Sequence, residues 1–133
     1  MLPKSKTSPV RDERAENWQL ITGFWEIALD VATIRIYIVG MKFVWDPKKN
    51  RENIRKHGID FRDATELFNH PMLVRLDTRQ DYGEDRWLGI GLLKNTVVVV
   101  VYIEWEDEET IRIISARKAT TYEADQYYQR LPH

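Results

Sequence analysis

Apolar and polar positions follow clear helical or strand periods from Lys42 to the C-terminus. The stretch 42–45 reads as a short strand. Asp46 followed by Pro47 then supplies a helix cap and a first helical residue, so the pattern predicts a helix from Pro47 to about His57 that ends at Gly58. A second helix is predicted after the cap residue Asp60 and ends before Pro71, because its apolar residues recur at helical spacing. These apolar residues are Phe61, Ala64, Leu67 and Phe68.

The next part of the chain predicts a run of strands with short connections. The strands cover 72–76, 86–93, 97–104 and 110–116, and Lys94-Asn95 makes a tight turn between the second and third. The stretch 97–102 is apolar without alternation, which is typical of a central strand covered on both faces. A capping box at 120–123 opens a last helix that runs to about Arg130. The order predicts an α+β fold, with an antiparallel sheet of four or five strands and helices packed on it.

The first 40 residues differ in character from the rest. The opening ten are polar and contain Pro and Ser, as in a disordered tail. Residues 17–40 are apolar and aromatic but fit neither period, except that Ile34, Ile36 and Ile38 alternate with other residues and allow a short strand. Since Met41 can begin a complete small domain, we divide the chain into an extension, 1–40, and a domain, 41–133. The hypothesis is that the extension is optional or reflects an upstream start site.

The amino-acid composition excludes several kinds of functional site and of binding. A chain of 133 residues suits one domain, and the absence of cysteine excludes disulfides, thiolate metal sites and Cys nucleophiles. The net charge of −1 excludes a nucleic-acid binder driven by bulk positive charge, so any such binding needs a local patch. No uncharged stretch of 18 residues is present, and the early basic residues are mixed with acids. We therefore expect neither a membrane segment nor a secretory signal, and a cytoplasmic location.

The first candidate site is the basic end of the first predicted helix. Lys49, Arg55 and Lys56 lie on this helix, and His57 ends it. Basic residues in a last turn complement the helix dipole, and charged helix faces are usually only solvated. The functional alternative is a phosphate-binding patch with a histidine at its edge, because histidine transfers protons near neutral pH.

The second candidate lies at the start of the 86–93 strand, where Glu84 and Arg86 are close in sequence. A surface ion pair of this kind contributes little, which is the structural alternative. Gly89 and Gly91 point to the face opposite Arg86. They leave room for a ligand or simply for a bulky helix side chain.

The third candidate is the 110–116 strand with its two arginines. Strict alternation puts Ser115 and Arg117 on one face with Ile113, and Arg112 on the other. The two arginines would then reach one phosphate only if a bulge intervened. Arginines in a well-patterned strand either extend to solvent or supply planar, bidentate donors for phosphate. The acidic run 104–109 lacks the spaced loop of a cation site, so no metal site is expected.

Taken together, these segments resemble the BrnT-type toxins. The resemblance rests on six pieces in the family's order, none of them specific alone. They are FVWDPKKN at 43–50, RKHGIDF at 55–61, AxxLF at 64–68, EDRWLGIG at 84–91, IRIISARKAT at 111–120 and ExxxY at 123–127. The resemblance covers essentially all of 41–133 and none of 1–40.

The resemblance implies a RelE-like α+β fold and a type II toxin–antitoxin system. It implies an endoribonuclease that inhibits translation and growth, with no metal or other cofactor. The implied partners are an RNA substrate and a ribbon-helix-helix antitoxin of the BrnA type, held in a hetero-oligomer. The antitoxin alone would bind operator DNA, and its binding would bury the active surface of the toxin.

Metal-free cleavage uses the 2′-OH of the RNA as nucleophile, and the enzyme must move two protons and stabilise charge on the phosphorane. Arg117 is our first choice for that charge and Arg86 the second. His57 or Glu84 acts as base or acid, with Lys56 as a substitute for either. We expect the remaining RNA contacts from Lys49, Arg55, Lys56, Arg112 and Ser115. The alternative function is a non-catalytic module that binds an antitoxin and corepresses its promoter.

Overall fold

A computed structural model describes residues 18–21, 26–30, 35–39, 41–107 and 109–131. The strands are β1 (Gln19–Ile21), β2 (Glu26–Asp30), β3 (Arg35–Val39), β4 (Lys42–Val44), β5 (Met72–Leu76), β6 (Trp87–Leu93), β7 (Thr96–Glu104) and β8 (Thr110–Lys118). The helices are α1 (Pro47–His57), α2 (Phe61–Ala64), the 3₁₀ helix η1 (Thr65–Asn69) and α3 (Thr121–Arg130). The expected disordered tail at 1–10 lies outside the described residues.

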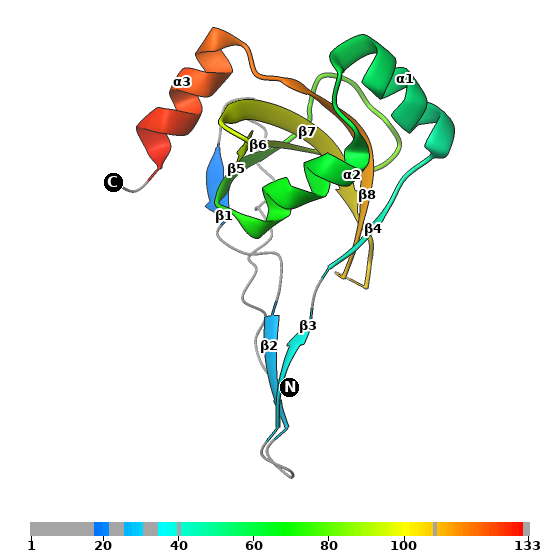
Figure 1. Cartoon of the computed structure of the whole chain (residues 1–133), viewed down its shortest axis with the longest axis vertical. Helices are drawn as coiled ribbons and strands as arrows, with labels where there is room; N and C mark the ends of the chain where they lie inside the picture. The colour runs from blue at the N-terminus through cyan, green and yellow to red at the C-terminus, as the bar shows by residue number, and fades with distance from the viewer. Residues whose placement is uncertain (1–17, 22–25, 31–34, 40, 108, 132–133) are drawn as a thin grey trace.

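The main sheet has six strands in the order β1-β5-β6-β7-β8-β4, and it is mixed (Figure 1). The α+β prediction is confirmed, but the predicted antiparallel sheet of four or five strands is wrong in two respects. First, β4 pairs in parallel with β8, with Lys42 opposite Thr110. Second, Gln19–Ile21 pairs with β5 and adds a sixth strand. The sequence did not indicate this strand, because Gln19–Ile21 lies in a stretch that fits neither the helical nor the strand period.

Two apolar clusters cover the two faces of the sheet. On one face, α2 and η1 bury Phe61, Ala64, Leu67 and Phe68 against β7 and β8, as their spacing predicted. The same cluster holds Ile21 of β1, which is 3% exposed. On the other face, Tyr127 of α3 packs with alternate residues of β5, β6 and β7. The central strand β7 is therefore covered on both sides, as its unbroken apolar run indicated.

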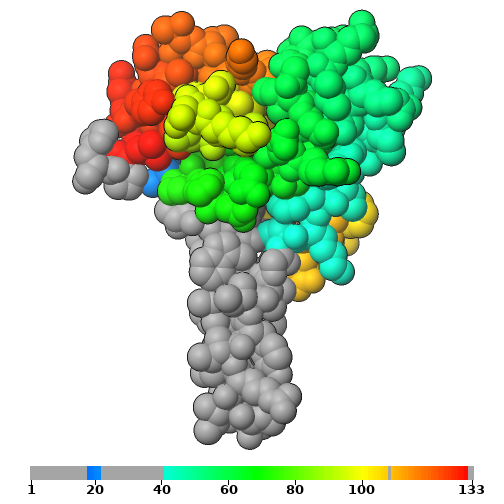
Figure 2. Space-filling view, in the orientation of Figure 1, coloured from blue at the N-terminus to red at the C-terminus, as the bar shows by residue number. Residues whose placement is uncertain are grey.

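Figure 2 shows how the helices lie relative to one another. In the space-filling view, α1 and α3 lie at opposite sides of the segment formed by α2 and η1. Their ends follow the predicted signals. Asp46 caps α1 by accepting a hydrogen bond from the backbone N–H of Lys48, and Gly58 ends it at φ 71°. Thr120 and Glu123 form the predicted capping box of α3.

The glycines of β6 serve packing. A side chain at Gly91 would meet Leu67 and Met72 at 3.1 Å, and one at Gly89 would collide with Met72. The space beside Gly89 and Gly91, for which the sequence allowed either a ligand or a bulky side chain, is therefore filled by side chains of η1 and β5. Lys94 and Asn95, both at positive φ, make the tight β6–β7 turn.

The remaining pair of strands forms a separate hairpin. β2 pairs with β3 in antiparallel fashion, with Glu26 opposite Val39 and Asp30 opposite Arg35. Figure 1 draws it apart from the six-stranded sheet. The short strand allowed by the alternating isoleucines corresponds to β3. Among the described residues, no helix is long and apolar enough to cross a membrane.

Candidate active site

A β-bulge in β8 decides which of its side chains share a face. Val101 of β7 pairs with Ser115, and the next residue, Tyr102, pairs with Ile113, so Ile114 is the extra residue. Residues directly opposite each other on antiparallel strands share a face. Arg117 lies opposite Val99 and Arg112 opposite Ile103, which places both arginines on one face with Ser115.

The strict alternation predicted for β8 is therefore wrong. Ile111, Ile113 and Ala116 are in the core cluster under α2 and η1, and the polar residues face the other way. An extra residue shifts the alternation by one, so Arg112 joins the side that Ser115 and Arg117 already occupy. The exception that the sequence left open, a bulge, is what the structure contains.

The basic helix α1 lies along the open edge of β8. β4 covers only the first part of this edge, because it ends opposite Arg112. Beyond it, the buried side chain of Asn53 donates to the backbone oxygens of Ile59 and Ala116, each at 2.9 Å. Asn53 also accepts from the backbone N–H of Ala116 at 3.1 Å. The amide thus replaces the missing strand neighbour and holds α1 against β8.

A pocket of about 230 Å³ lies between α1 and β8 beside this contact. It is lined by Lys49, Glu52, Asn53, Lys56 and His57 of α1 and by Ile114 and Ser115 of β8. The pocket joins the first and third candidate regions of the sequence. It offers a hydroxyl, an amide, two ammonium groups, an imidazole and the carboxylate of Glu52. The cations suit a phosphate group, and the imidazole suits proton transfer.

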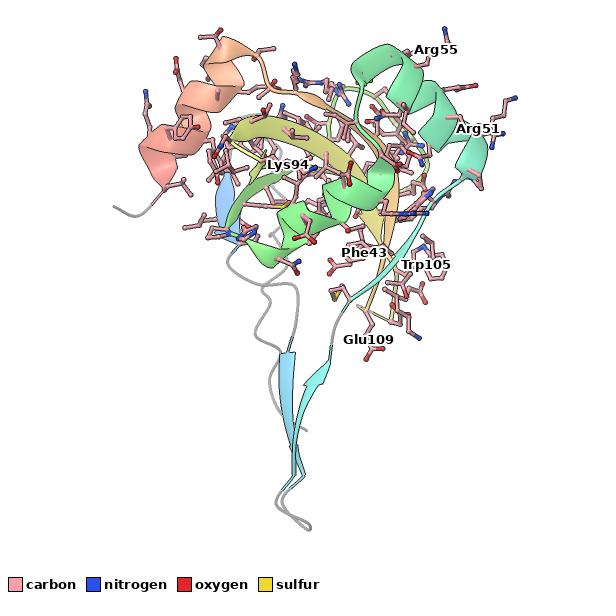
Figure 3. All side chains as sticks on the ribbon, viewed as in Figure 1. Phe43, Arg51, Arg55, Lys94, Trp105 and Glu109 are labelled. Carbon is pink, nitrogen blue, oxygen red and sulfur yellow. The ribbon has the colours of Figure 1, made fainter. Side chains whose placement is uncertain are left out.

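Arg55 does not line this pocket. Figure 3 shows Arg51 and Arg55 pointing outward from α1, away from the sheet. Lys49 and Lys56 are seven residues apart and share the pocket side of the helix with Asn53. The structure therefore separates Arg55 from the other basic residues predicted to contact RNA.

Arg117 is held by an ion pair with the first turn of α3. Its Nη1 and Nη2 donate to the two carboxylate oxygens of Glu123 at 2.8 and 2.9 Å, and Nη1 also donates to the backbone oxygen of Lys118. The pKa of Glu123 is lowered to about 2, mainly by the hydrogen bonds from Arg117 and further by the hydrogen bond from the backbone N–H of Thr120. The N–H of Nε and the second N–H of Nη2 donate no hydrogen bond to the described residues. These two donors point to the same side of the planar guanidinium.

Arg86 directly precedes β6, which begins at Trp87 rather than at the predicted residue 86, and alternation puts it on the same face as the other arginines. Leu88 and Ile90, which alternate with it along β6, belong to the cluster under α3, and Leu92 packs against that cluster. The guanidinium stacks on the Tyr82 ring at 4.2 Å and contacts Glu84 at 3.3 Å. Glu84 therefore lies next to Arg86, before the start of β6. His57 lines the pocket beside β8, and β7 lies between β6 and β8 in the sheet.

The loop that carries Glu84 is organised by Asp77. This buried carboxylate accepts two hydrogen bonds at 2.8 Å from the side chain of Arg79 and one at 3.1 Å from the Tyr82 hydroxyl. Burial alone would raise the pKa of Asp77, but the hydrogen bonds from Arg79 and Tyr82 leave the pKa below its usual value. Asp77 thereby fixes Tyr82, on which Arg86 stacks.

Comparison with protein-family models identifies the chain. Residues 45–123 match the model of BrnT, described as the ribonuclease toxin of a type II toxin–antitoxin system. The chain belongs to the BrnT family. A search of the curated proteins found no match. The resemblance inferred from the ordered motifs is confirmed.

The matched range contains every site residue predicted from the sequence. It begins at Trp45, just before α1, and ends at Glu123, the partner of Arg117. Strands β1 to β4 precede it. As a BrnT toxin, the chain has an antitoxin as its partner and ribonuclease as its activity class.

Sequence reasoning missed three residues that shape this site. Asn53 was passed over because one polar residue in a polar helix carries no signal. Glu123 was recognised as a helix cap, but its contact with Arg117 depends on how β8 enters α3. Ile114 looks like any other strand residue until its pairing is known.

Within the described ranges, no group of three or more His, Asp or Glu residues could hold a metal ion.

Proposed function

We propose that this BrnT toxin is a metal-independent endoribonuclease whose active surface combines the α1–β8 pocket with the arginines of the adjoining sheet face. The carrying observation is the bulge at Ile114. It puts Arg112, Ser115 and Arg117 on one face, next to the pocket that contains His57. A local concentration of cations is what an RNA-binding protein with a net charge of −1 requires.

The proposed reaction is attack of the RNA 2′-OH on the adjacent phosphorus, with departure of the 5′ oxygen. Arg117 stabilises charge on the phosphorane, and its fork of Nε and Nη2 suits two phosphate oxygens. Glu123 orients this fork. Arg112 and Arg86 lie on the same face and supply further positive charge.

The acid and base come from His57 and Glu84, with Lys56 as a substitute for either. The position of His57 in the pocket with Ser115 favours it for a proton transfer at the scissile group. Glu84 contacts Arg86, so it also acts by orienting that guanidinium. Lys49, Lys56 and Ser115 hold the RNA backbone in the pocket, and Arg55 contacts RNA only where the strand continues past α1.

The finer points of the biology belong to the same proposal. The fold is RelE-like, the antitoxin is a ribbon-helix-helix protein of the BrnA type in a hetero-oligomer with the toxin, and operator DNA binds through the antitoxin. The complex is cytoplasmic. Residues 41–133 form the toxin domain and 1–40 an extension.

Growth of cells that express the full chain from a tight promoter tests this function, with RNA integrity followed in parallel. We expect growth arrest and RNA breakdown, both reduced in Arg117→Ala and His57→Ala. Arg62→Ala, an exposed cation on α2, is the matched control and should remain toxic. Equal toxicity of all three variants would refute the assigned residues. Normal growth with intact RNA and soluble protein would favour the non-catalytic module that binds antitoxin and corepresses its promoter.

A further inference from the structure

The outer face of α1 carries a basic stripe outside the α1–β8 pocket. Lys48, Arg51 and Arg55 are spaced by three and four residues, so they share one side of the helix. All three are exposed, and in the described part of the chain their charged groups form no ion pair. Ile54 lies beside them and is 41% exposed. An apolar side chain within a basic stripe favours a protein contact over a purely solvated face.

The β7–β8 hairpin carries the opposite combination. Trp105 is 45% exposed, Glu106 follows it directly, and Glu109 lies four residues after it along the hairpin. A hollow of about 440 Å³ beside Trp105 is lined by residues 103–107. Asp107 is committed to the turn, since its carboxylate accepts from the backbone N–H groups of Glu109 and Thr110. Glu106, which is exposed, and Glu109, which is half-buried, carry negative charge for a contact outside the hairpin.

The basic stripe and the acidic tip, by which we mean Glu106 and Glu109 of the β7–β8 hairpin, lie at the two ends of one edge of the molecule. The tip adjoins the start of β4, where the N–H of Lys42 donates to the backbone oxygen of Glu109. The end of β4 leads directly into α1. Figure 3 shows Arg51 and Arg55 at one end of this edge and Trp105 and Glu109 at the other. A two-fold axis across the middle of the edge would set each basic stripe opposite an acidic tip.

We propose that a second copy of this chain binds along this edge to form an isologous dimer. The stripe of each copy contacts the tip of the other, and Ile54 and Trp105 supply the apolar part of the contact. Of the described residues, four large apolar side chains are exposed, and two of them fall within these two charged surfaces. Charge complementarity fixes the orientation, and the apolar pair loses its contact with water.

Charge reversal tests the dimer by sedimentation of the full chain. One variant carries Lys48→Glu and Arg51→Glu, and the other carries Glu106→Lys and Glu109→Lys. Each should be a monomer, because like charges then face each other in both contacts. An equimolar mixture of the two should recover a dimer, since both contacts of the mixed pair are attractive. The wild type should sediment at twice the 15.9 kDa of one chain and dissociate as salt rises.

The controls separate this arrangement from other occupants. Arg62→Glu with Arg130→Glu makes the same change in charge on α2 and α3, and it should leave the dimer intact. A wild type that stays monomeric up to about 100 μM would overturn the proposal and leave the stripe to RNA or to an acidic partner protein. A dimer that persists in both reversed variants, or a mixture that does not recombine, would also overturn it.

Discussion

At the scale of single residues, Arg117 and Glu123 link the proposed active surface to the start of α3. Glu123 caps the helix by accepting from the backbone N–H of Thr120 and binds both terminal nitrogens of Arg117. The sequence revealed the cap because a capping box is local. It could not reveal the ion pair, which depends on the path of the chain from β8 into α3.

Glu123→Gln should lower the free energy of unfolding by about 1–2 kcal/mol at pH 7, since a partly exposed pair contributes less than its pKa shift implies. The pKa of Glu123 is depressed from 4.5 to about 2 in the folded chain. Its contribution is therefore complete above about pH 4.5 and is lost as the pH falls towards 2. Urea unfolding at several pH values measures the difference, with Asp125→Asn, an exposed carboxylate on α3, as control. A difference that persists undiminished at pH 2 would contradict this account.

At the scale of elements, the buried side chain of Asn53 hydrogen-bonds α1 to β8. Most element boundaries were predictable because caps, Gly58 and the β6–β7 turn act locally. The bulge at Ile114 was not, because pairing with β7 decides it. The parallel β4–β8 pair likewise joins segments about 70 residues apart, so no local pattern marks it.

Asn53→Ala should cost about 2–4 kcal/mol of unfolding free energy, because it leaves buried backbone groups of Ile59 and Ala116 without partners. Guanidinium unfolding measures the loss. Asn69→Ala removes only an exposed 3.4 Å bond to Glu66 and should change stability by less than about 0.5 kcal/mol. Equal stability of the two variants would mean that Asn53 does not hold α1 on the sheet.

Gly58→Ala should destabilise the chain by about 1 kcal/mol, because only glycine adopts the left-handed cap conformation without strain. No side chain lies within 4 Å of the position, so a steric clash does not contribute. Thermal unfolding measures the change. A variant as stable as the wild type would show that α1 ends differently from the described cap.

At the scale of the whole molecule, the extension joins the sheet through β1. Ile21 is buried in the core, and Trp18 stacks on Arg75 with its ring centre 4.7 Å from the guanidinium carbon. The sequence separated 1–40 from the rest by its weak pattern. It did not predict β1, because the pairing with β5 is the only evidence for so short a strand.

A fragment of residues 41–133 should fold and remain soluble, with a free energy of unfolding lower by about 1.5–3 kcal/mol because the burial of Ile21 is lost. Urea unfolding of the fragment and of the full chain measures this, and a fragment of residues 18–133 should recover most of the difference. An insoluble 41–133 fragment beside a folded full chain would refute the division into an extension and a complete domain.

The central claim is that this toxin cuts RNA without a metal ion, using one basic face and the adjoining pocket. The most direct measurement is cleavage of a labelled RNA by the purified full chain in the presence of chelator. We expect cleavage to persist, to leave 2′,3′-cyclic phosphate ends, and to fall about 100-fold in Arg117→Ala, with Arg62→Ala unchanged. Cleavage abolished by chelator, or equal in Arg117→Ala and the wild type, would contradict the account.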